Sequence, residues 1–191
     1  EARGAKAIAL RPDGADPAPL AGAIDSVAER FGRLDILVNS AGVLLLGPVD
    51  QFSLDDFDRT VDVNVRGVFV ASKAAAAHMR EGGRIINISS TNADRMPFAG
   101  GAVYAMSKSA LTGLAKGMAR DLGSRGITIN NVNPGPIDTD MNPANTDFAA
   151  SLHGLMALPR HGQADEVAGM VAYLASAEAA FVTGADLLID G

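Results

Sequence analysis

A tyrosine and a lysine four residues apart are the clearest chemical feature of this chain. Tyr104 and Lys108 stand in a segment with a helical pattern, where that spacing brings both side chains to one face, one turn apart. A phenol titrates near pH 10 in water, so it serves as an acid or base only when a neighbouring positive charge favours its ionised form. We expect Lys108 to supply that charge and lower the pKa of Tyr104. Because such a pair also arises by chance, further residues must support it.

Apolar β-rich runs alternate with longer helical patterns along the chain. The expected strands are 6–10, 34–39, 84–89, 127–133 and 185–189, and the expected helices are 19–31, 54–79, 101–122 and 164–174. This alternation predicts right-handed crossovers and a mostly parallel sheet with helices on both faces. The expected fold class is α/β, a doubly wound, Rossmann-like sheet in one domain spanning 1–191.

Small or turn-forming residues follow three of the expected strands. Ser90 follows the strand 84–89, the segment Asn39 to Gly42 closes the strand 34–39, and the segment Asn133 to Pro136 closes the strand 127–133. In open parallel sheets, ligands bind in the crevice outside the carboxyl ends of the strands. The three strand ends are therefore expected to meet at one crevice.

The composition and net charge of the chain limit the kinds of partner that it can bind. A net charge of −6 and a pI near 4.9 argue against nucleic acid and acidic membranes, and no apolar run is long enough to cross a bilayer. The chain has no cysteine, which fits a reducing cytoplasm. His78, His153 and His161 lack the spacing of metal ligands, so we expect no metal site. Small molecules and copies of the chain itself are the expected partners.

Five motifs in a fixed order then resemble the short-chain dehydrogenase/reductase family. They are Asn39-Ser-Ala-Gly42, Asn64 in Val63-Asn-Val-Arg-Gly67, Ser90, Tyr104-x-x-x-Lys108 and Pro134-Gly-Pro-Ile-Asp-Thr139. The segments 95–100, 159–162 and 166–170 are similar to a bacterial branch of the family. That branch includes 3-oxoacyl-carrier-protein reductases and a cyclic-di-GMP-binding regulator of biofilm dispersal.

The resemblance implies a catalytic set of four residues. Tyr104 would exchange a proton with the substrate oxygen, and Lys108 would lower its pKa and hold the nicotinamide ribose. Ser90 would hydrogen-bond the substrate oxygen, while Asn64 would hold a water that links Lys108 to solvent. From position alone, Asn64 could equally be a helix-interior amide that satisfies a neighbouring backbone.

The resemblance also implies a site for NAD or NADP. The residues implied to contact the cofactor are Asp13, Asn39, Ala41, Gly42, Tyr104, Lys108, Pro134, Gly135, Ile137 and Thr139. Asp13 could also be an ordinary loop residue, because Gly14 departs from the β-branched neighbour usual in the family. The segment 140–159 corresponds to a substrate lid. The lid side chains expected to line the site are Phe148, Leu152, Leu155 and Met156, which could also be the core of a short amphipathic helix.

The glycine-rich turn that grips the pyrophosphate in this family does not occur in the chain. The chain resembles the family from its third strand onward, so we expect it to lack the first two βα units, to leave that strand unpaired, and to expose the edge of strand 34–39. NAD and NADP cannot be told apart without the end of the second strand. The expected function is an NAD(P)-dependent oxidoreductase acting on a carbonyl or secondary alcohol, 3-oxoacyl-carrier-protein reductase-like, working as a homodimer or homotetramer. The alternative is a cyclic-di-GMP-binding regulator on the same fold.

Overall fold

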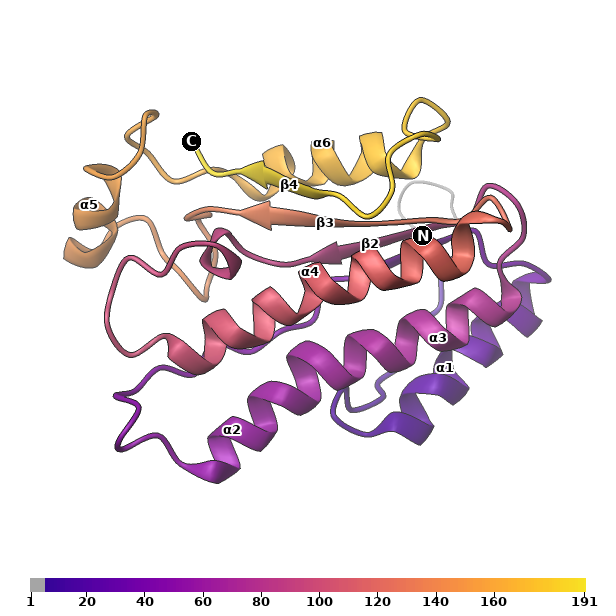
Figure 1. Ribbon diagram of the computed structural model, residues 1–191, viewed down its shortest axis with the longest axis horizontal. Helices are drawn as coiled ribbons and strands as arrows, with labels where there is room; N and C mark the ends of the chain where they lie inside the picture. Colours follow the sequence, from indigo (N-terminus) through magenta and orange to yellow (C-terminus); the bar gives the residue numbers. More distant parts are fainter. Residues whose placement is uncertain (1–5) are drawn as a thin grey trace.

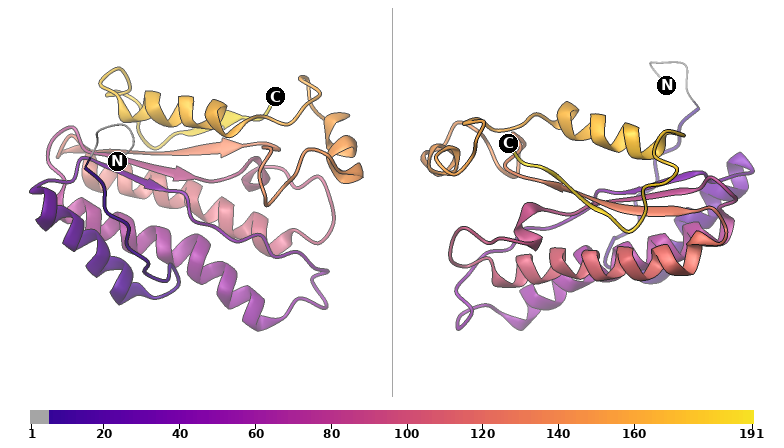
Figure 2. Two further views of the ribbon diagram at one scale, coloured as in Figure 1. Left: turned by 180° about the vertical axis from the view of Figure 1, so that it is seen from behind. Right: turned by 45° about the horizontal axis from the view of Figure 1, so that its top comes forward.

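A computed structural model describes residues 6–191 as four parallel strands packed between helices. The strands are β1 (Ile36–Asn39), β2 (Arg84–Ile88), β3 (Thr128–Pro134) and β4 (Asp186–Ile189), and they pair in the order β1-β2-β3-β4. Long helices cover one face of this sheet and a single helix covers the other (Figures 1 and 2). The expected α/β fold with a parallel sheet in a single domain is confirmed.

The covering helices pack apolar side chains against the two faces. On one face lie α1 (Pro17–Phe31), α3 (Val68–His78) and α4 (Ala102–Gly123), which enclose a core around Ile85, Ile127 and Ile129. On the other face, α6 (Ala164–Ala175) packs Leu174 against Ile86 and Val132. The strands alternate their side chains between these two cores, as a sheet buried on both faces requires.

The helix expected at 54–79 contains a change of helical type. It consists of α2 (Leu54–Val61), the π-helical turn η1 (Asp62–Gly67) and α3. Ser53 caps its start, because its hydroxyl accepts a hydrogen bond from the Asp56 N–H at 3.0 Å. A π-helical turn is rare and widens the helix locally, often at a functional site. Asn64 lies inside this turn.

The prediction of a strand at residues 6–10 is wrong. These residues belong to no strand, because a strand forms only where a neighbour supplies hydrogen bonds, and none of residues 11–191 pairs with them. The short element η2 (Thr91–Ala93) was not among the expected helices, whereas α5 (Asp147–His153) is a short helix of the kind given above as the alternative for the segment with Phe148 and Leu152. Within 6–191, no helix has the length and apolar character needed to cross a membrane.

Candidate active site

A cleft of about 1200 Å³ opens at the carboxyl ends of the strands, and Ser90 and Tyr104 both line it. Ser90 follows β2 and caps η2, where its Oγ accepts a hydrogen bond from the Asn92 N–H at 3.1 Å. That contact uses a lone pair of the hydroxyl oxygen and leaves the Ser90 proton free for another acceptor. Tyr104 stands in the first turn of α4. The two hydroxyl-bearing residues expected to meet a substrate therefore share one cleft.

Lys108 lies one turn further along α4 and is buried, with 5% of its surface exposed. Its Nζ donates a hydrogen bond to the Ile88 carbonyl oxygen at 2.9 Å and lies 5.8 Å from the centre of the Tyr104 ring. Burial lowers the pKa of Lys108 to about 8. The Lys108 ammonium is therefore held beside the phenol. Its pKa of about 8 means that it loses its proton only slightly above neutral pH.

The expectation that Lys108 lowers the pKa of Tyr104 is wrong for this structure. Burial raises the pKa of Tyr104, and its interaction with the Ser90 hydroxyl offsets that effect only in part. The reason is that Tyr104 loses more water contact on burial than the Ser90 hydroxyl replaces. Tyr104 is consequently held in its protonated form, which is the form that donates a proton.

Asn64 joins the loop after β1 to helix α4. Its Oδ1 accepts a hydrogen bond from the Val43 N–H and its Nδ2 donates to the Val43 carbonyl oxygen, both at 2.9 Å. The same Nδ2 donates to the Ser107 Oγ at 3.0 Å, and Ser107 in turn donates to the Tyr104 carbonyl oxygen at 2.7 Å. The amide thus satisfies a neighbouring backbone, and it also ties that backbone to the helix that carries Tyr104. Ser107 was missed by the sequence analysis.

Gly42 lies between Asn64 and Lys108, two of the residues expected in the catalytic set. A Cβ at this position would lie 3.4 Å from the Asn64 Oδ1 and 3.5 Å from the Lys108 Nζ. Those are ordinary contacts, whereas Gly135 has no room for a side chain, since a Cβ there would lie 2.8 Å from the Cα of Asp190, directly after β4. These two glycines let backbone from β1 and β3 approach the floor of the cleft. The backbone at the ends of β1 and β3 thus lies close to Lys108 and to the cleft, which is the placement that the nicotinamide half of a dinucleotide requires.

The residues expected at a cofactor occupy three different environments. Pro134, Gly135, Ile137 and Thr139 line the cleft together with Tyr104. Ala41 and Gly42 belong to the loop that Asn64 holds, although Ser40 is the member of that loop that lines the cleft. Asp13 lies outside the cleft, where its Oδ1 accepts from the Ala15 N–H at 2.9 Å and lies 3.8 Å from the Arg59 Nη1.

The side chain of Asn39 belongs to a row of hydrogen-bonded amides that crosses the sheet. Its Nδ2 donates to Asn87 Oδ1 at 2.8 Å, Asn87 Nδ2 donates to Asn131 Oδ1 at 2.9 Å, and Asn131 Nδ2 donates to Asp186 Oδ1 at 2.7 Å. Each donor and acceptor are partners in the strand register. We call these four residues the amide ladder. Asn39 thereby fixes the end of β1, next to the loop that carries Gly42.

Apolar side chains form the wall of the cleft that faces Tyr104. All four residues expected in the lid line the cleft, and Phe148 meets Phe98 edge to face with ring centres 5.4 Å apart. Among the lining residues, only Arg95 and Asp190 carry charge. Within the described residues 6–191, no cluster of side chains suits a metal ion. The cleft therefore combines a small polar floor with an apolar wall.

Comparison with known proteins agrees with this geometry. A family model described as enoyl-(acyl carrier protein) reductase matches residues 1–191. The cyclic-di-GMP-binding biofilm dispersal mediator protein of Escherichia coli is 57% identical over 169 residues, which are 88% of this chain and 71% of that protein.

Two solved structures are also close in fold. A short-chain dehydrogenase/reductase from Serratia marcescens has a TM-score of 0.98 and 59% identity, with 100% of this chain and 78% of that chain covered. A short chain dehydrogenase from Burkholderia cenocepacia in complex with NADP has a TM-score of 0.98 and 52% identity, with the same coverage.

The helix-covered parallel sheet and the similarity to dehydrogenases and reductases define an α/β oxidoreductase. The chain belongs to the short-chain dehydrogenase/reductase family.

Proposed function

We propose that this protein is an NADP(H)-dependent oxidoreductase that interconverts an apolar carbonyl compound and its secondary alcohol. The observation that carries the proposal is the placement of Tyr104 and Ser90 on the polar floor of an apolar cleft, with the Lys108 ammonium behind Tyr104. Solved relatives bound to NADP or NADPH support the cofactor. Of the two dinucleotides, we therefore favour NADP.

In reduction, Tyr104 donates its phenolic proton to the carbonyl oxygen. Tyr104 holds this proton before reaction, because burial raises its pKa, and it gives the proton up as negative charge develops on the substrate oxygen. The free proton of Ser90 hydrogen-bonds the same oxygen and stabilises its developing negative charge. Lys108 places a positive charge near the phenolate that forms, and Asn64 with Ser107 fixes the backbone around both residues.

The residues available to hold the cofactor lie at the ends of β1 and β3. Lys108, Gly42 and the segment from Pro134 to Thr139 would surround the nicotinamide half. When bound, the cofactor supplies a hydride to the carbonyl carbon or accepts one from the alcohol. The apolar wall excludes water from this region, which strengthens the interactions of Ser90 and Lys108 with charge on the substrate.

The lining of the cleft favours an uncharged, largely apolar substrate. Leu46, Phe148 and Met156 line the cleft together with Ser90 and Tyr104, and a charged group would meet only Arg95 or Asp190. Ketones with aliphatic or aromatic bodies fit this chemistry. A 3-oxoacyl thioester on a carrier protein is a specific case, because its acyl chain is apolar.

The test is NADPH oxidation by the purified protein with a panel of aliphatic ketones, aromatic ketones and a 3-oxoacyl thioester. We expect turnover with at least one of them, and a loss of about a hundredfold or more in Tyr104→Phe, because general acid catalysis contributes about that much. Tyr173→Phe is the matched control, since Tyr173 is the only other tyrosine and is exposed on α6. Absence of turnover across the panel, or full activity in Tyr104→Phe, would contradict the proposal.

A second candidate is a cyclic-di-GMP-binding regulator. The observation that favours it is the 57% identity to the E. coli protein of that name. The lining of the cleft favours it less, because Arg95 is the only basic residue there to meet two phosphates. Isothermal titration calorimetry with cyclic-di-GMP decides between them: micromolar or tighter binding that Arg95→Ala abolishes supports the regulator, and absence of binding removes it.

We further propose that the protein works as a homodimer or homotetramer. Helices α3 and α4 lie side by side on one face of the sheet (Figure 1), and they carry the exposed side chains of Phe69 and Met106. Packing between copies of these helices would bury both side chains. Light scattering of the purified protein gives the oligomeric mass, and a monomer at high concentration would exclude this arrangement.

A further inference from the structure

Helix α5, which forms part of the cleft wall, is held to the molecule by a pair of histidines. The His153 Nε2 lies 2.8 Å from the His161 Nδ1, and the two rings are nearly perpendicular with centres 5.0 Å apart. His153 is the last residue of α5, and His161 precedes α6. At the other end of the helix, Phe148 contacts Phe98 across the cleft. The mechanism proposed above uses neither histidine.

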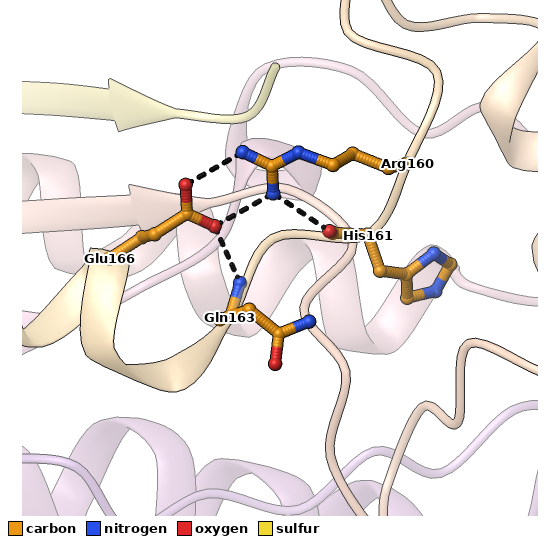
Figure 3. A network of polar contacts seen from close by, with 4 residues as sticks. All are labelled: Arg160, His161, Gln163 and Glu166. Atoms are coloured by element: carbon orange, nitrogen blue, oxygen red, sulfur yellow. Dashed lines mark hydrogen bonds and ion pairs between the residues drawn. The ribbon is translucent and has the colours of Figure 1, made fainter.

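A network of polar contacts anchors the backbone that carries His161 (Figure 3). Arg160 forms two hydrogen bonds with Glu166 at 2.7 and 2.8 Å and a third with the His161 carbonyl oxygen at 3.0 Å. Gly162 accepts a hydrogen bond from the Asp138 N–H and donates one to the Pro136 carbonyl oxygen, both at 2.9 Å. These contacts hold the backbone of His161 in place beside residues 134–139, the segment expected at the nicotinamide.

By contrast, α5 is a short helix that extends beyond the carboxyl ends of β3 and β4, away from the other helices (Figure 1). Ala149 and Leu152 bury its inner side, while most of its remaining residues are exposed. Seven residues are too few for a helix to be stable by itself. The position of α5 therefore depends on its side-chain contacts, including the contact between His153 and His161.

The hydrogen bond between the two imidazoles persists when one of the rings is protonated but not when both are. A neutral pair forms one N–H···N hydrogen bond, and a singly protonated pair keeps it, with His153 donating to the His161 Nδ1. If both rings are protonated, every ring nitrogen is a donor, so two N–H groups and two positive charges face each other. His161 is 3% exposed and its Nε2 has no partner, so a charge on this ring would lack water to stabilise it.

We propose that the His153–His161 pair is a proton-sensitive latch for α5. The latch holds this wall of the cleft in place while the pair carries at most one proton, and it releases the wall when both rings are protonated.

The charged groups around the pair set the pH of release. Burial, followed by the nearby His153, lowers the pKa of His161, and Asp138 acts in the opposite direction. Arg160 and Glu166 lie on the other side, and their ion pair keeps the pKa of Glu166 at about 2, so Glu166 stays ionised in the range tested. Because the pKa of His161 is below 6.5 in the folded state, the latch is fully effective above about pH 6.5 and weakens as the pH falls further.

The test is hydrogen exchange of the whole chain, followed by mass spectrometry of peptides covering 147–158 and corrected for the intrinsic effect of pH on exchange. We expect the protection of α5 to fall severalfold between pH 7 and pH 5, while α4 keeps its protection. His153→Gln keeps a side-chain donor and acceptor for either form of His161 and removes the second positive charge, so its protection should depend on pH less than that of the unmodified chain. His153→Leu removes the hydrogen bond, so its protection should be low at both pH values.

His78→Gln is the matched control, because His78 is the only other histidine and pairs with Asp25 at 2.7 Å, on α3 and α1. It should behave as the unmodified chain does. The proposal is overturned if His153→Gln loses protection with falling pH as the unmodified chain does, or if His153→Leu keeps full protection.

A kinetic consequence rests on the proposed function. With the best ketone of the panel, His153→Leu should raise KM at pH 7 with little change in kcat, because α5 lines the cleft without touching the reacting atoms. Since exchange is measured without substrate or cofactor, failure of the oxidoreductase proposal leaves the test of the latch intact.

Discussion

The Lys108 ammonium stabilises charge in the proposed reaction at a cost to the stability of the fold. Its pKa of about 8, compared with 10.5 in water, corresponds to about 3 kcal/mol of unfavourable burial in the charged form. The hydrogen bond to the Ile88 carbonyl oxygen returns about 1 kcal/mol of this cost. Such a residue is expected where function requires a charge in a buried place.

We therefore predict that Lys108→Met abolishes reductase activity and raises the free energy of unfolding by about 2 kcal/mol at pH 7 without cofactor. The sign follows from the lowered pKa. Below about pH 8 the folded and unfolded states both hold the proton, so the cost is present in full; from pH 8 to 10.5 only the unfolded state still holds it. The advantage of the variant should shrink over that range and vanish above it.

Urea unfolding of both proteins at pH 7 and pH 10 checks this prediction. Lys116→Met is the control, because Lys116 is exposed on the same helix and should change stability by less than about 0.5 kcal/mol. A variant that is less stable than the unmodified chain at pH 7 would show that Lys108 contributes more through its contacts than its burial costs.

At the scale of single residues, much of the site follows from sequence because the signals are local. The spacing of Tyr104 and Lys108 on a helix, and the position of Ser90 directly after a strand, are properties of short segments. The direction of the pKa shift of Tyr104 is different, because it depends on how deeply distant segments bury the phenol. Sequence spacing contains no measure of that burial.

Among the elements, the amide ladder shows what local sequence leaves undetermined. It joins four strands, and Ser72 on α3 and Thr112 on α4 extend it at its ends through hydrogen bonds of 3.0 Å each. A shift of one strand by a single residue would place an apolar side chain in the row and leave buried amides without partners. The ladder therefore favours one register, but its members are 44 to 55 residues apart and no local pattern links them.

We predict that Asn87→Val lowers the free energy of unfolding by about 2–3 kcal/mol, because it removes two hydrogen bonds and leaves the buried Asn131 Oδ1 without its donor. The midpoint of urea unfolding measures the effect. Asn145→Ala, in the exposed segment before α5, should have almost none. If Asn87→Val and Asn145→Ala unfold at the same urea concentration, the ladder adds nothing to stability.

The π-helical turn η1 is a second feature that appears only in the folded protein. The sequence predicts a continuous helix over 54–79, and its apolar pattern does not distinguish 3.6 residues per turn from the wider π-helical turn. The three hydrogen bonds of Asn64, to Val43 and to Ser107, fix the turn to two other segments. The change of helical type thus follows from tertiary contacts of a residue that the sequence analysis had already selected.

At the scale of the whole molecule, helices cover the sheet unevenly, and the edge strand β1 is left partly exposed. Side chains of β1 point alternately to the two faces of the sheet. Leu37 is buried in the core that α3 covers, whereas Ile36 and Val38 on the opposite face are 45% and 41% exposed. Among residues 6–191, no strand pairs with the outer edge of β1. An edge strand with free backbone groups and exposed β-branched side chains is a template for pairing with another chain.

We accordingly predict that the 191-residue chain also associates through its β1 edge, beyond the proposed homodimer or homotetramer, and that Ile36→Lys reduces its light scattering at equal concentration. A lysine on the open face places a charge where two edges would meet, so each added copy increases repulsion. Val49→Lys is the matched control, because Val49 is 79% exposed in the turn before α2 and lies away from the sheet. Equal scattering from both variants would locate the association elsewhere, with the exposed faces of α3 and α4 as the next surface to test.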